Sequence, residues 1–355
     1  MKKKILFSVV HRKDRSPSQR FRFEQYLDIL KDNGFEVEFL FLLNPKDDKA
    51  FYSKGNYFKK LIIVLKSIVK LLQSISKSYD IVFVQRESFF LGTVIFEKIY
   101  SKKAWLVYDF DDSIWLSNVS EANKKLSFLK NANKTKELIS FSNMVFAGNE
   151  YLAQYARQYN TNVKIVPTTI DTEEYKRIPQ PQREKICIGW SGSITTIQHF
   201  EYAIPALKII KEKYKNLVYF KVIGDANYKN DDLGVIGLPW VKDTEIEDLS
   251  EIEIGIMPLP DDEWSKGKCG LKGLQYMALG IATLMSPVGV NDEIIQHGKN
   301  GFLPKTVDDW VSQLSLLIED KNLRESVAKA GRKTVVEKYS VMAWKDSYIK
   351  FLKEL

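Results

Sequence analysis

The sequence predicts an α/β protein made of two doubly wound domains, each a parallel sheet covered by helices. Short apolar runs alternate along the chain with longer amphipathic segments, which is the order of strands and helices in such a sheet. The chain has 355 residues, more than one domain usually contains. Hydrophobic residues form 45% of the chain, which is enough apolar material for two separate cores.

The first domain is predicted over residues 1–170. Helical periodicity occupies the intervals between its strands, for example from Gln19 to Asn33 and from Glu150 to Tyr159. The strands themselves are expected in short apolar runs at Lys4–Val9, Glu36–Phe41, Ile81–Gln85, Trp105–Asp109, Met144–Ala147 and Lys164–Val166.

A proline-containing segment without a periodic apolar face, residues 171–185, is expected to link the two domains. The second domain is predicted over residues 186–338, and we expect the two domains to face each other across a cleft. The chain then ends in a predicted helical tail, of which residues 339–355 are expected to pack back on the first domain. The strands of the second domain are predicted at Ile186–Trp190, Val218–Ile223, Ile252–Met257 and Ala282–Ser286.

Composition and charge argue against several other classes of protein. The net charge of +8 attracts anions in general, but the lysines are spread along the chain and no RNA-binding aromatic signature occurs, so nucleic acid is not expected as a partner. Cys187 and Cys269 are too far apart in sequence to indicate a disulfide framework or a metal cluster, which fits the cytoplasm. No run of about 20 apolar residues that could span a membrane occurs. The three histidines are scattered, so no metal site is predicted.

The most informative loop is Lys266–Gly280, because ligands of open α/β sheets bind beyond the carboxyl ends of the strands. Its glycines precede a helix, whose first backbone N–H groups and dipole suit a diphosphate. Lys268 and Lys272 add two cationic donors, and Gln275 lies one turn further along, within reach of a ribose hydroxyl. The alternative is a surface helix whose lysines are only solvated.

A second candidate region follows the first strand, where Ser18 is expected to cap a helix. Arg20 and Arg22 carry planar donor groups that match phosphate geometry. We therefore predict that they hold the diphosphate of a donor or a phosphorylated acceptor. The alternative, equally open, is that they pair with carboxylates such as Glu24.

Three carboxylates, Asp109, Asp111 and Asp112, follow the fourth predicted strand. Such a cluster could bind a metal, but we assign none and take Asp111 and Asp109 as candidate catalytic groups. Either carboxylate could accept a proton from an acceptor or orient a donor hydroxyl. Arg86 ends the neighbouring strand and is expected beside the aspartates, at the acceptor or diphosphate site. The alternative is that the aspartates only cap a helix or pair with Arg86.

The segment Tyr57–Lys77 is predicted to be an amphipathic helix in which lysines interleave with aliphatic residues. One interpretation is contact with an anionic membrane, at whose inner face lipid-linked acceptors lie. The other is a helix that covers the sheet and turns a lysine-rich face outward, which the position of the segment between two strands favours.

Several segments together resemble the family-four glycosyltransferases of the GT-B fold. The helix-start loop is similar to the donor-binding half of a bacterial subgroup with the pattern Lys-Cys-Gly-x-Lys-x-x-Gln-Tyr-Met-Ala, which is typically assigned to surface polysaccharide synthesis. The resemblance covers nearly the whole chain in the expected order, through Ser16–Arg22, Tyr108–Asp112, Gly189–Ser193, Lys266–Gly280, Ser286–Asn291 and Gly298–Leu303.

The resemblance implies a retaining glycosyltransferase of the hexosyltransferase type. It would move a sugar from a nucleotide diphosphate sugar to a saccharide or lipid-linked acceptor, without a metal or another cofactor. The first domain would then bind the acceptor and the second the donor, with a family histidine near the reaction centre replaced at or beside Asp111. The implied donor-binding residues are Ser191, Gly192, Ser193, Lys268, Cys269, Gly270, Leu271, Lys272 and Gln275.

The sequence departs from the family pattern in its charged residues. Two family glutamates fall here on Gly267 and Gln275, and Gly267 has no side chain to hold a donor sugar. The usual Arg and Lys after the first strand of the second domain are also missing. We infer that Lys268 and Lys272 neutralise the diphosphate in their place.

Two other functions therefore stay open. The missing glutamate is compatible with an inactive binding protein or partner subunit that keeps the fold. A nucleotide-sugar epimerase has the same two-domain shape, but it needs carboxylate–histidine pairs, and histidines are sparse here. A dehydrogenase fits poorly because no Gly-x-Gly-x-x-Gly follows the first strand.

Overall fold

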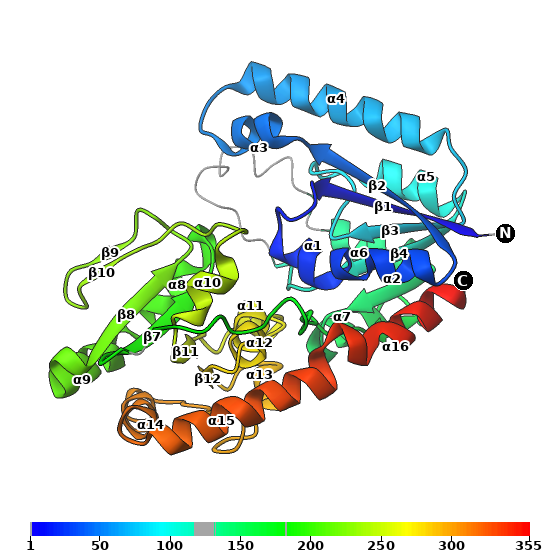
Figure 1. Ribbon diagram of the computed structural model, residues 1–355. Helices are drawn as coiled ribbons and strands as arrows, with labels where there is room; N and C mark the ends of the chain where they lie inside the picture. Colours follow the sequence, from blue (N-terminus) through cyan, green and yellow to red (C-terminus); the bar gives the residue numbers. More distant parts are fainter. Residues whose placement is uncertain (1, 117–130, 132, 182) are drawn as a thin grey trace. The chain divides into compact units, whose positions relative to one another are not determined.

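The computed structural model describes residues 2–116, 131, 133–181 and 183–355, and the chain divides into two compact units (Figure 1). Unit 1 contains Met1–Thr168 together with Lys345–Leu355, and unit 2 contains Thr169–Trp344. Each unit has a parallel sheet connected by helices. The predicted fold class, two Rossmann-like α/β domains, is confirmed.

Within the described residues, the sheet of unit 1 has six parallel strands in the order β2–β1–β3–β4–β5–β6. Strands β3 and β5 have the predicted bounds, and the others differ by one or two residues at their ends. Helices cover the sheet, so a strand such as β3 is buried throughout and appears in sequence as a continuous apolar run. The bounds are β1 Lys3–His11, β2 Phe35–Leu43, β3 Ile81–Gln85, β4 Trp105–Phe110, β5 Met144–Ala147 and β6 Val163–Ile165.

The predicted helix from Gln19 to Asn33 is interrupted in the structure. Phe23 leaves the helical conformation with φ −142°, and its buried ring stacks on Phe7 with the ring centroids 4.8 Å apart. Packing of this aromatic ring outweighs the helical periodicity. The helices of unit 1 are α1 Pro17–Arg22, the 3₁₀ turn η1 Glu24–Tyr26, α2 Leu27–Asp32, α3 Pro45–Tyr52, α4 Tyr57–Ile75, α5 Ile95–Ser101, α6 Lys134–Phe141, α7 Glu150–Arg157 and α16 Val341–Lys353.

Helix α1 begins two residues earlier than the sequence suggested. Ser16 is the residue before the helix and Pro17 is its first residue, a position where the missing N–H of proline costs nothing. Ser18 is therefore the second residue inside the helix and not its cap, which corrects the prediction.

The core of unit 1 is aromatic and includes a residue from the far end of the chain. Tyr348 of α16 is fully buried and stacks on Tyr26 with ring centroids 4.2 Å apart. It also contacts Phe146 edge-on at 5.4 Å, and Phe83 lies 5.0 Å from Phe7 within the same cluster. Residues 345–355 are thus part of unit 1 (Figure 1).

Within the described residues, the main sheet of unit 2 has four parallel strands in the order β12–β11–β7–β8, with a short antiparallel ribbon of β9 and β10. The bounds are β7 Ile186–Ser191, β8 Val218–Ile223, β9 Lys229–Asn230, β10 Val235–Ile236, β11 Ile254–Met257 and β12 Ala282–Met285. The helices and turns are η3 Ile194–Thr196, α8 Ile197–Glu201, α9 Ile204–Tyr214, η4 Lys215–Leu217, α10 Glu245–Ser250, α11 Glu263–Lys266, α12 Leu271–Ala278, α13 Asn291–Ile294, α14 Val307–Glu319, α15 Lys321–Thr334 and η5 Val335–Tyr339. The helical tail of the chain is thus interrupted after Glu319 and after Tyr339.

The segment expected to be a linker is partly built into unit 2. Tyr175 is only 1% exposed, and its hydroxyl donates to a carboxylate oxygen of Glu245 at 2.8 Å. Arg332 of α15 donates to the carbonyl oxygen of Tyr175 at 2.9 Å. This part of the segment is therefore fixed by packing and hydrogen bonds, which its lack of apolar periodicity did not indicate.

Candidate functional site

The strand order of each sheet places its ligand-binding edge. In open α/β sheets ligands bind at the carboxyl ends of the strands, where the order of the strands reverses. In unit 1 this reversal lies between β1 and β3, and in unit 2 it lies between β7 and β11. The loops that follow these four strands contain most of the residues that the sequence singled out.

In unit 2 the loop after β11 leads into α12. Gly270 precedes the helix with φ +70°, a left-handed conformation that glycine adopts without strain, and a Cβ there would meet the side chain of Ile294 at 2.4 Å. The helix then begins at Leu271, and the first N–H groups of any helix have no acceptor inside it. Cys269 is buried just before this start. The predicted helix start is thus present, and binding of an anion there stays a prediction.

Both predicted lysines lie at this helix start and are half-buried over aromatic rings. Lys272 Nζ is 5.5 Å from the centre of the Trp190 ring, and Lys268 Nζ is 5.2 Å from that of Trp264. A cation over an indole face is attracted by the negative charge of the ring face. The two ammonium groups are therefore positioned by neighbouring side chains and are not simply solvated on a surface helix.

A hydrogen bond ties α12 to the loop after β7. The backbone N–H of Ser191 donates to Tyr276 Oη at 2.7 Å, and the Ser191 hydroxyl lies 3.1 Å from the same oxygen. Burial raises the pKa of Tyr276 to about 12, so the hydroxyl keeps its proton at neutral pH. The structure thus brings together the two predicted donor-binding segments, the one after β7 and the one after β11.

The loop after β7 is shaped by its small residues. Ser193 and Thr196 form a capping box at the start of η3, in which each side chain bonds to the backbone of the other residue. A Cβ on Gly192 would lie 2.2 Å from the Trp190 ring, so only glycine fits there. Of the three predicted residues, Ser191 is buried and Ser193 is exposed at the strand end.

Gln275 is buried and its side-chain amide has protein partners. Its Nε2 atom donates to the Tyr175 hydroxyl at 3.2 Å and to a carboxylate oxygen of Glu245 at 3.1 Å. Trp240 Nε1 donates to the same carboxylate at 3.0 Å. The sequence did not indicate this buried network, and the contact between Gln275 and a ribose hydroxyl stays a prediction.

In unit 1 the residues after β3 and β4 form an ion-pair cluster. Arg86 Nε donates to Asp111 Oδ1 at 3.0 Å, its Nη2 atom is paired with Asp112, and Gln85 Nε2 lies 3.4 Å from Asp111 Oδ1. Burial lowers the pKa of Arg86, but the charges of Asp111 and Asp112 outweigh this effect and raise it. Arg86 also has φ +61°, a strained backbone conformation for a side-chain residue. The cluster holds this conformation, with Asp111 12% exposed.

Asp109 does not join this cluster. It is 1% exposed and forms a bidentate ion pair with Arg22, whose Nε lies 3.1 and 3.2 Å from the two carboxylate oxygens. Arg22 also donates to the carbonyl oxygen of Val166. Burial raises the pKa of Asp109, and the charge of Arg22 opposes this shift. This differs from the expectations that Asp109 is catalytic and that Arg22 holds a phosphate, because each side chain is buried against the other.

The remaining candidates after β1 are also mostly enclosed. Arg20 is 5% exposed, with its guanidinium carbon 4.9 Å from the ring centre of Phe21. Ser18 is half-buried on α1. Glu24, the carboxylate named as an alternative partner, accepts from the backbone N–H of Asp14 at 2.8 Å. Burial raises the pKa of Glu24, and the nearby charge of Arg20 opposes this shift. For Arg22 the alternative of a carboxylate partner is confirmed, and the partner is Asp109.

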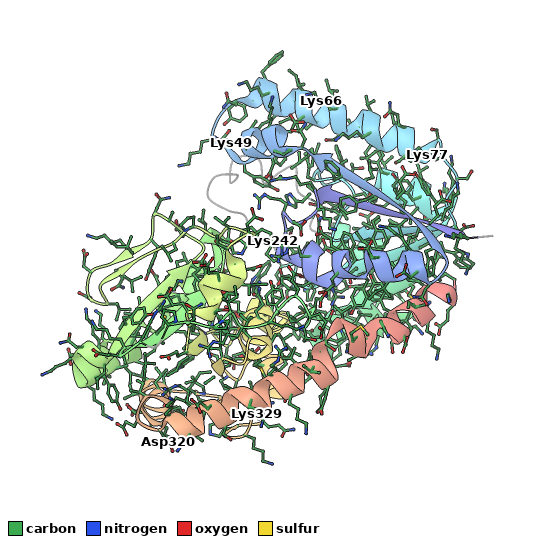
Figure 2. The ribbon with its side chains drawn as sticks, in the orientation of Figure 1. Lys49, Lys66, Lys77, Lys242, Asp320 and Lys329 are labelled. Atoms are coloured by element: carbon green, nitrogen blue, oxygen red, sulfur yellow. The ribbon has the colours of Figure 1, made fainter. Side chains whose placement is uncertain are left out.

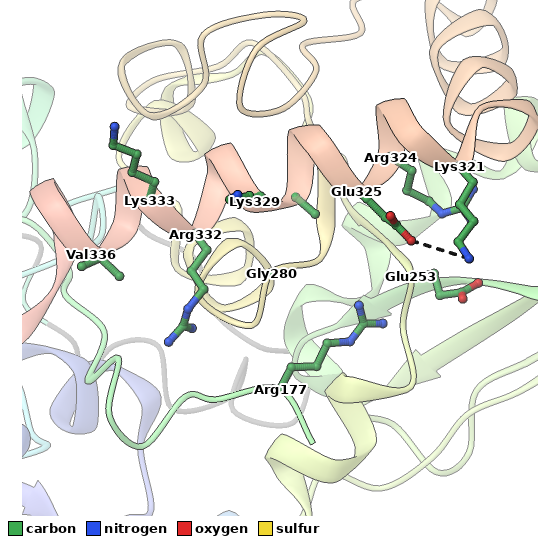
Figure 3. A pocket seen from close by; sticks show the side chains of 11 residues that line it. Arg177, Glu253, Gly280, Lys321, Arg324, Glu325, Lys329, Arg332, Lys333 and Val336 are labelled. Carbon is green, nitrogen blue, oxygen red and sulfur yellow. Dashed lines mark ion pairs between the residues drawn. The ribbon is translucent and has the colours of Figure 1, made fainter. Parts of the chain in front are cut away.

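A pocket of about 540 Å³ in unit 2 lies away from the helix start (Figure 3). It is lined by Glu253 and Gly280, which precede β11 and β12, so it lies toward the amino ends of these strands. Its arginines bind the protein itself. Arg177 donates to the carbonyl oxygens of Ser250, at the end of α10, and of Ile252. Arg332 donates to carbonyl oxygens that include that of Tyr175. These contacts hold the first residues of unit 2 in place.

Two further features are the possible metal ligands and the histidines His199 and His297. Among the residues that the structure describes, no group of three or more His, Cys, Asp or Glu side chains is arranged to hold a metal ion. His199 is 4% exposed, whereas His297 is exposed.

Comparison with known proteins identifies the type of the second unit. Residues 185–320, which contain β7 and the α12 helix start, match the family described as "Glycosyl transferases group 1". This segment is therefore similar to group 1 glycosyltransferases. An uncharacterized glycosyltransferase of Methanocaldococcus jannaschii is 26% identical over 177 residues, 47% of this chain and 44% of that protein. The sulfoquinovosyl transferase of Arabidopsis thaliana is 30% identical over 151 residues, 39% of this chain and 28% of that protein. The matched parts thus span less than half of either relative.

Similarity to solved structures extends over both units. The Anabaena protein HepE, crystallised with UDP and glucose, superimposes with a TM-score of 0.65 over 99% of this chain and 100% of its own, at 15% identity. The fold of the chain is therefore that of GT-B glycosyltransferases. The finer subgroup suggested by the Lys-Cys-Gly pattern stays a prediction.

Proposed function

We propose that this protein is a glycosyltransferase that moves a sugar from a nucleotide diphosphate sugar to a saccharide or lipid-linked acceptor, with retention of the anomeric configuration. We further propose that it acts in the cytoplasm, in the synthesis of a cell-surface polysaccharide. The observation that carries the proposal is the start of α12. There, a helix N-terminus and two positioned lysines stand beside the loop after β7, in the segment of group 1 type.

The proposed chemistry is mainly electrostatic. The leaving nucleoside diphosphate gains negative charge as the sugar–oxygen bond breaks, and donors that are already in place stabilise this charge without reorganising. Lys268, Lys272 and the first N–H groups of α12 would supply these donors. Asp111 would act in unit 1 as the base for the acceptor or as the group that orients a donor hydroxyl.

Replacing Lys272 with alanine is expected to weaken binding of a nucleoside diphosphate by about 1.5–3 kcal/mol, the range for a hydrogen bond to a charged group. Titration calorimetry with UDP, GDP, ADP and dTDP would measure the change after a thermal-shift screen has identified the nucleotide that binds. Lys321→Ala is the matched control, because Lys321 lies in the same unit with its side chain 72% exposed, outside the helix start. Equal affinities of the Lys272 variant and the wild type would remove Lys272 from the site.

Chelation of metals with EDTA is expected to leave transfer activity largely intact. The proposed site already supplies positive charge through the helix start and two lysines, so it needs no divalent cation at the diphosphate. Activity assays with and without EDTA would measure this. Loss of activity that manganese restores would contradict the prediction. It would indicate that the carboxylates after β4 are metal ligands.

An inactive partner subunit is the second candidate function. Gly267 favours it, since this buried position offers no side chain toward a donor sugar. A subunit of this kind would still bind nucleotide, so binding alone does not separate the two functions. Hydrolysis or transfer of a sugar from any nucleotide sugar, measured with the purified protein, would exclude it.

A further inference from the structure

Helix α4 packs on unit 1 through an unusually polar and narrow face. Its buried residues are Ile63, Ser67, Leu71 and Ser74, and the helix contacts β2 at the edge of the sheet. Ser67 Oγ donates to the carbonyl oxygen of Ile63 at 2.8 Å, and the Ser74 hydroxyl is bonded to that of Tyr100. Two of the four inward side chains are therefore serines that satisfy their own hydroxyl groups.

The opposite face of α4 is apolar and lies on the protein surface. The apolar side chains of this face, from Phe58 to Leu72, recur along the helix every three or four positions. At 3.6 residues per turn they fall within an arc of about 100°. A helix of a soluble domain normally places such a stripe toward the core. The side chains and their exposed fractions are Phe58 76%, Leu61 53%, Ile62 37%, Leu65 55%, Val69 52% and Leu72 52%.

This arrangement corrects the interpretation that α4 turns a lysine-rich face outward. The helix does cover β2, but lysines flank the outward stripe and do not form it. Around the helix axis, Lys59, Lys66 and Lys70 fall on one side of the stripe, between it and the buried face. Figure 2 shows Lys66 on α4 and Lys77 just beyond its end.

The charge of α4 is entirely positive. The segment Tyr57–Ile75 contains four lysines and no Asp or Glu. Lys66 is 59% exposed, and Lys70 is anchored to the carbonyl oxygens of Phe41 and Leu42. An apolar stripe with a basic flank is the pattern of helices that lie in the interface of an anionic membrane.

We propose that α4 docks unit 1 on the surface of an anionic lipid bilayer, with its apolar stripe among the acyl chains and Lys59 and Lys66 at the headgroups. Among the described residues, no helix has both the length and the apolar character needed to cross a bilayer. The helix would therefore lie on the membrane. A second copy of the chain fits the surface less well, because pairing two α4 helices would bring their lysines together without any acidic partner on either helix.

The proposal does not rest on the proposed transferase activity, and its test uses binding alone. The full-length protein is sedimented with vesicles of phosphatidylcholine, with or without phosphatidylglycerol, at low and high salt. We expect the protein to bind the anionic vesicles. We also expect this binding to weaken at high salt, because salt screens the charge of the lysines. Failure of the wild type to sediment with anionic vesicles at low salt would overturn the proposal.

Two variants separate the contributions of the stripe and the lysines. Leu61→Ser/Leu65→Ser/Val69→Ser is expected to lower the vesicle partition coefficient at least about tenfold, since three exposed side chains lose their apolar contact with lipid. Lys59→Gln/Lys66→Gln is expected to lower binding to anionic vesicles but not the weak binding to neutral ones.

A matched control and an oligomer measurement complete the test. Ile209→Ser/Leu316→Ser/Val336→Ser removes exposed aliphatic side chains from unit 2 and is expected to bind vesicles as the wild type does. Circular dichroism melting checks that each variant is folded. Unchanged vesicle binding by the α4 stripe variant would overturn the proposal. So would analytical ultracentrifugation that shows a wild-type dimer lost in that variant, together with no vesicle binding by either protein, because a second copy would then cover α4.

Discussion

Replacement of Arg22 with leucine is expected to lower the free energy of unfolding by about 3–5 kcal/mol, the cost of leaving a buried charge without its partner. The side chains of Arg22 and Asp109 are 0% and 1% exposed, so water cannot replace the lost contact. Chemical denaturation, monitored by circular dichroism, would measure the change. Arg22→Leu/Asp109→Asn is the control, and it is expected to recover part of the loss because the buried charge is removed.

The loss of stability in Arg22→Leu is also expected to depend on pH in one direction. Burial already raises the pKa of Asp109 and Arg22 lowers it, so removing Arg22 raises it further. The folded variant then binds a proton more readily than the unfolded chain does, and its stability falls as pH rises through the raised pKa. A smaller deficit at mildly acidic than at alkaline pH is the expected result. A pH-independent loss below about 1 kcal/mol would show that the pair is not buried as described.

Replacement of Asp111 with asparagine is expected to lower turnover at least about tenfold, the low end of what a positioned acid–base group contributes. Asparagine keeps the shape of the side chain but loses its charge and its basicity. Nucleotide affinity is expected to survive, because the proposed donor contacts lie in unit 2. Steady-state kinetics with the nucleotide sugar identified by thermal shift would separate kcat from KM.

Asp112 provides the comparison for Asp111, because both carboxylates pair with Arg86. If Asp111 acts on substrate, Asp112→Asn lowers turnover less than Asp111→Asn does. If both act only by holding Arg86, the two variants lose turnover and thermal stability together. Normal turnover in a folded Asp111→Asn variant would remove Asp111 from the catalytic assignment.

Local patterns in the sequence predicted the strands well, because strands buried on both faces appear as continuous apolar runs. They did not predict partners that are distant in sequence. Arg22 and Asp109 are 87 positions apart, and Gln275 bonds to Tyr175, which is 100 positions away. Such pairs form only when the sheet is assembled, so arginine and carboxylate side chains that looked available for ligands proved to be buried together.

The helix α4 shows a second limit of sequence patterns. Periodicity located the helix and its apolar and basic positions, and the structure begins it at the predicted Tyr57. Periodicity does not tell which face turns inward, since two of the four buried side chains here are the serines Ser67 and Ser74. The candidate donor site was easier to predict from local spacing. Lys268, Lys272 and the glycine before α12 lie close in sequence, so their spacing alone indicated that they lie at one helix start.

The C-terminal helix α16 has a consequence for how the chain is made. Unit 1 is discontinuous, since Tyr348 completes an aromatic core whose other members, such as Tyr26 and Phe146, are synthesised much earlier. During translation, residues 1–168 therefore emerge from the ribosome with part of their core uncovered, whereas unit 2 is continuous and can close first. The first domain to be translated is thus the last to reach its final packing, and a nascent chain shorter than 348 residues carries an unfilled aromatic site.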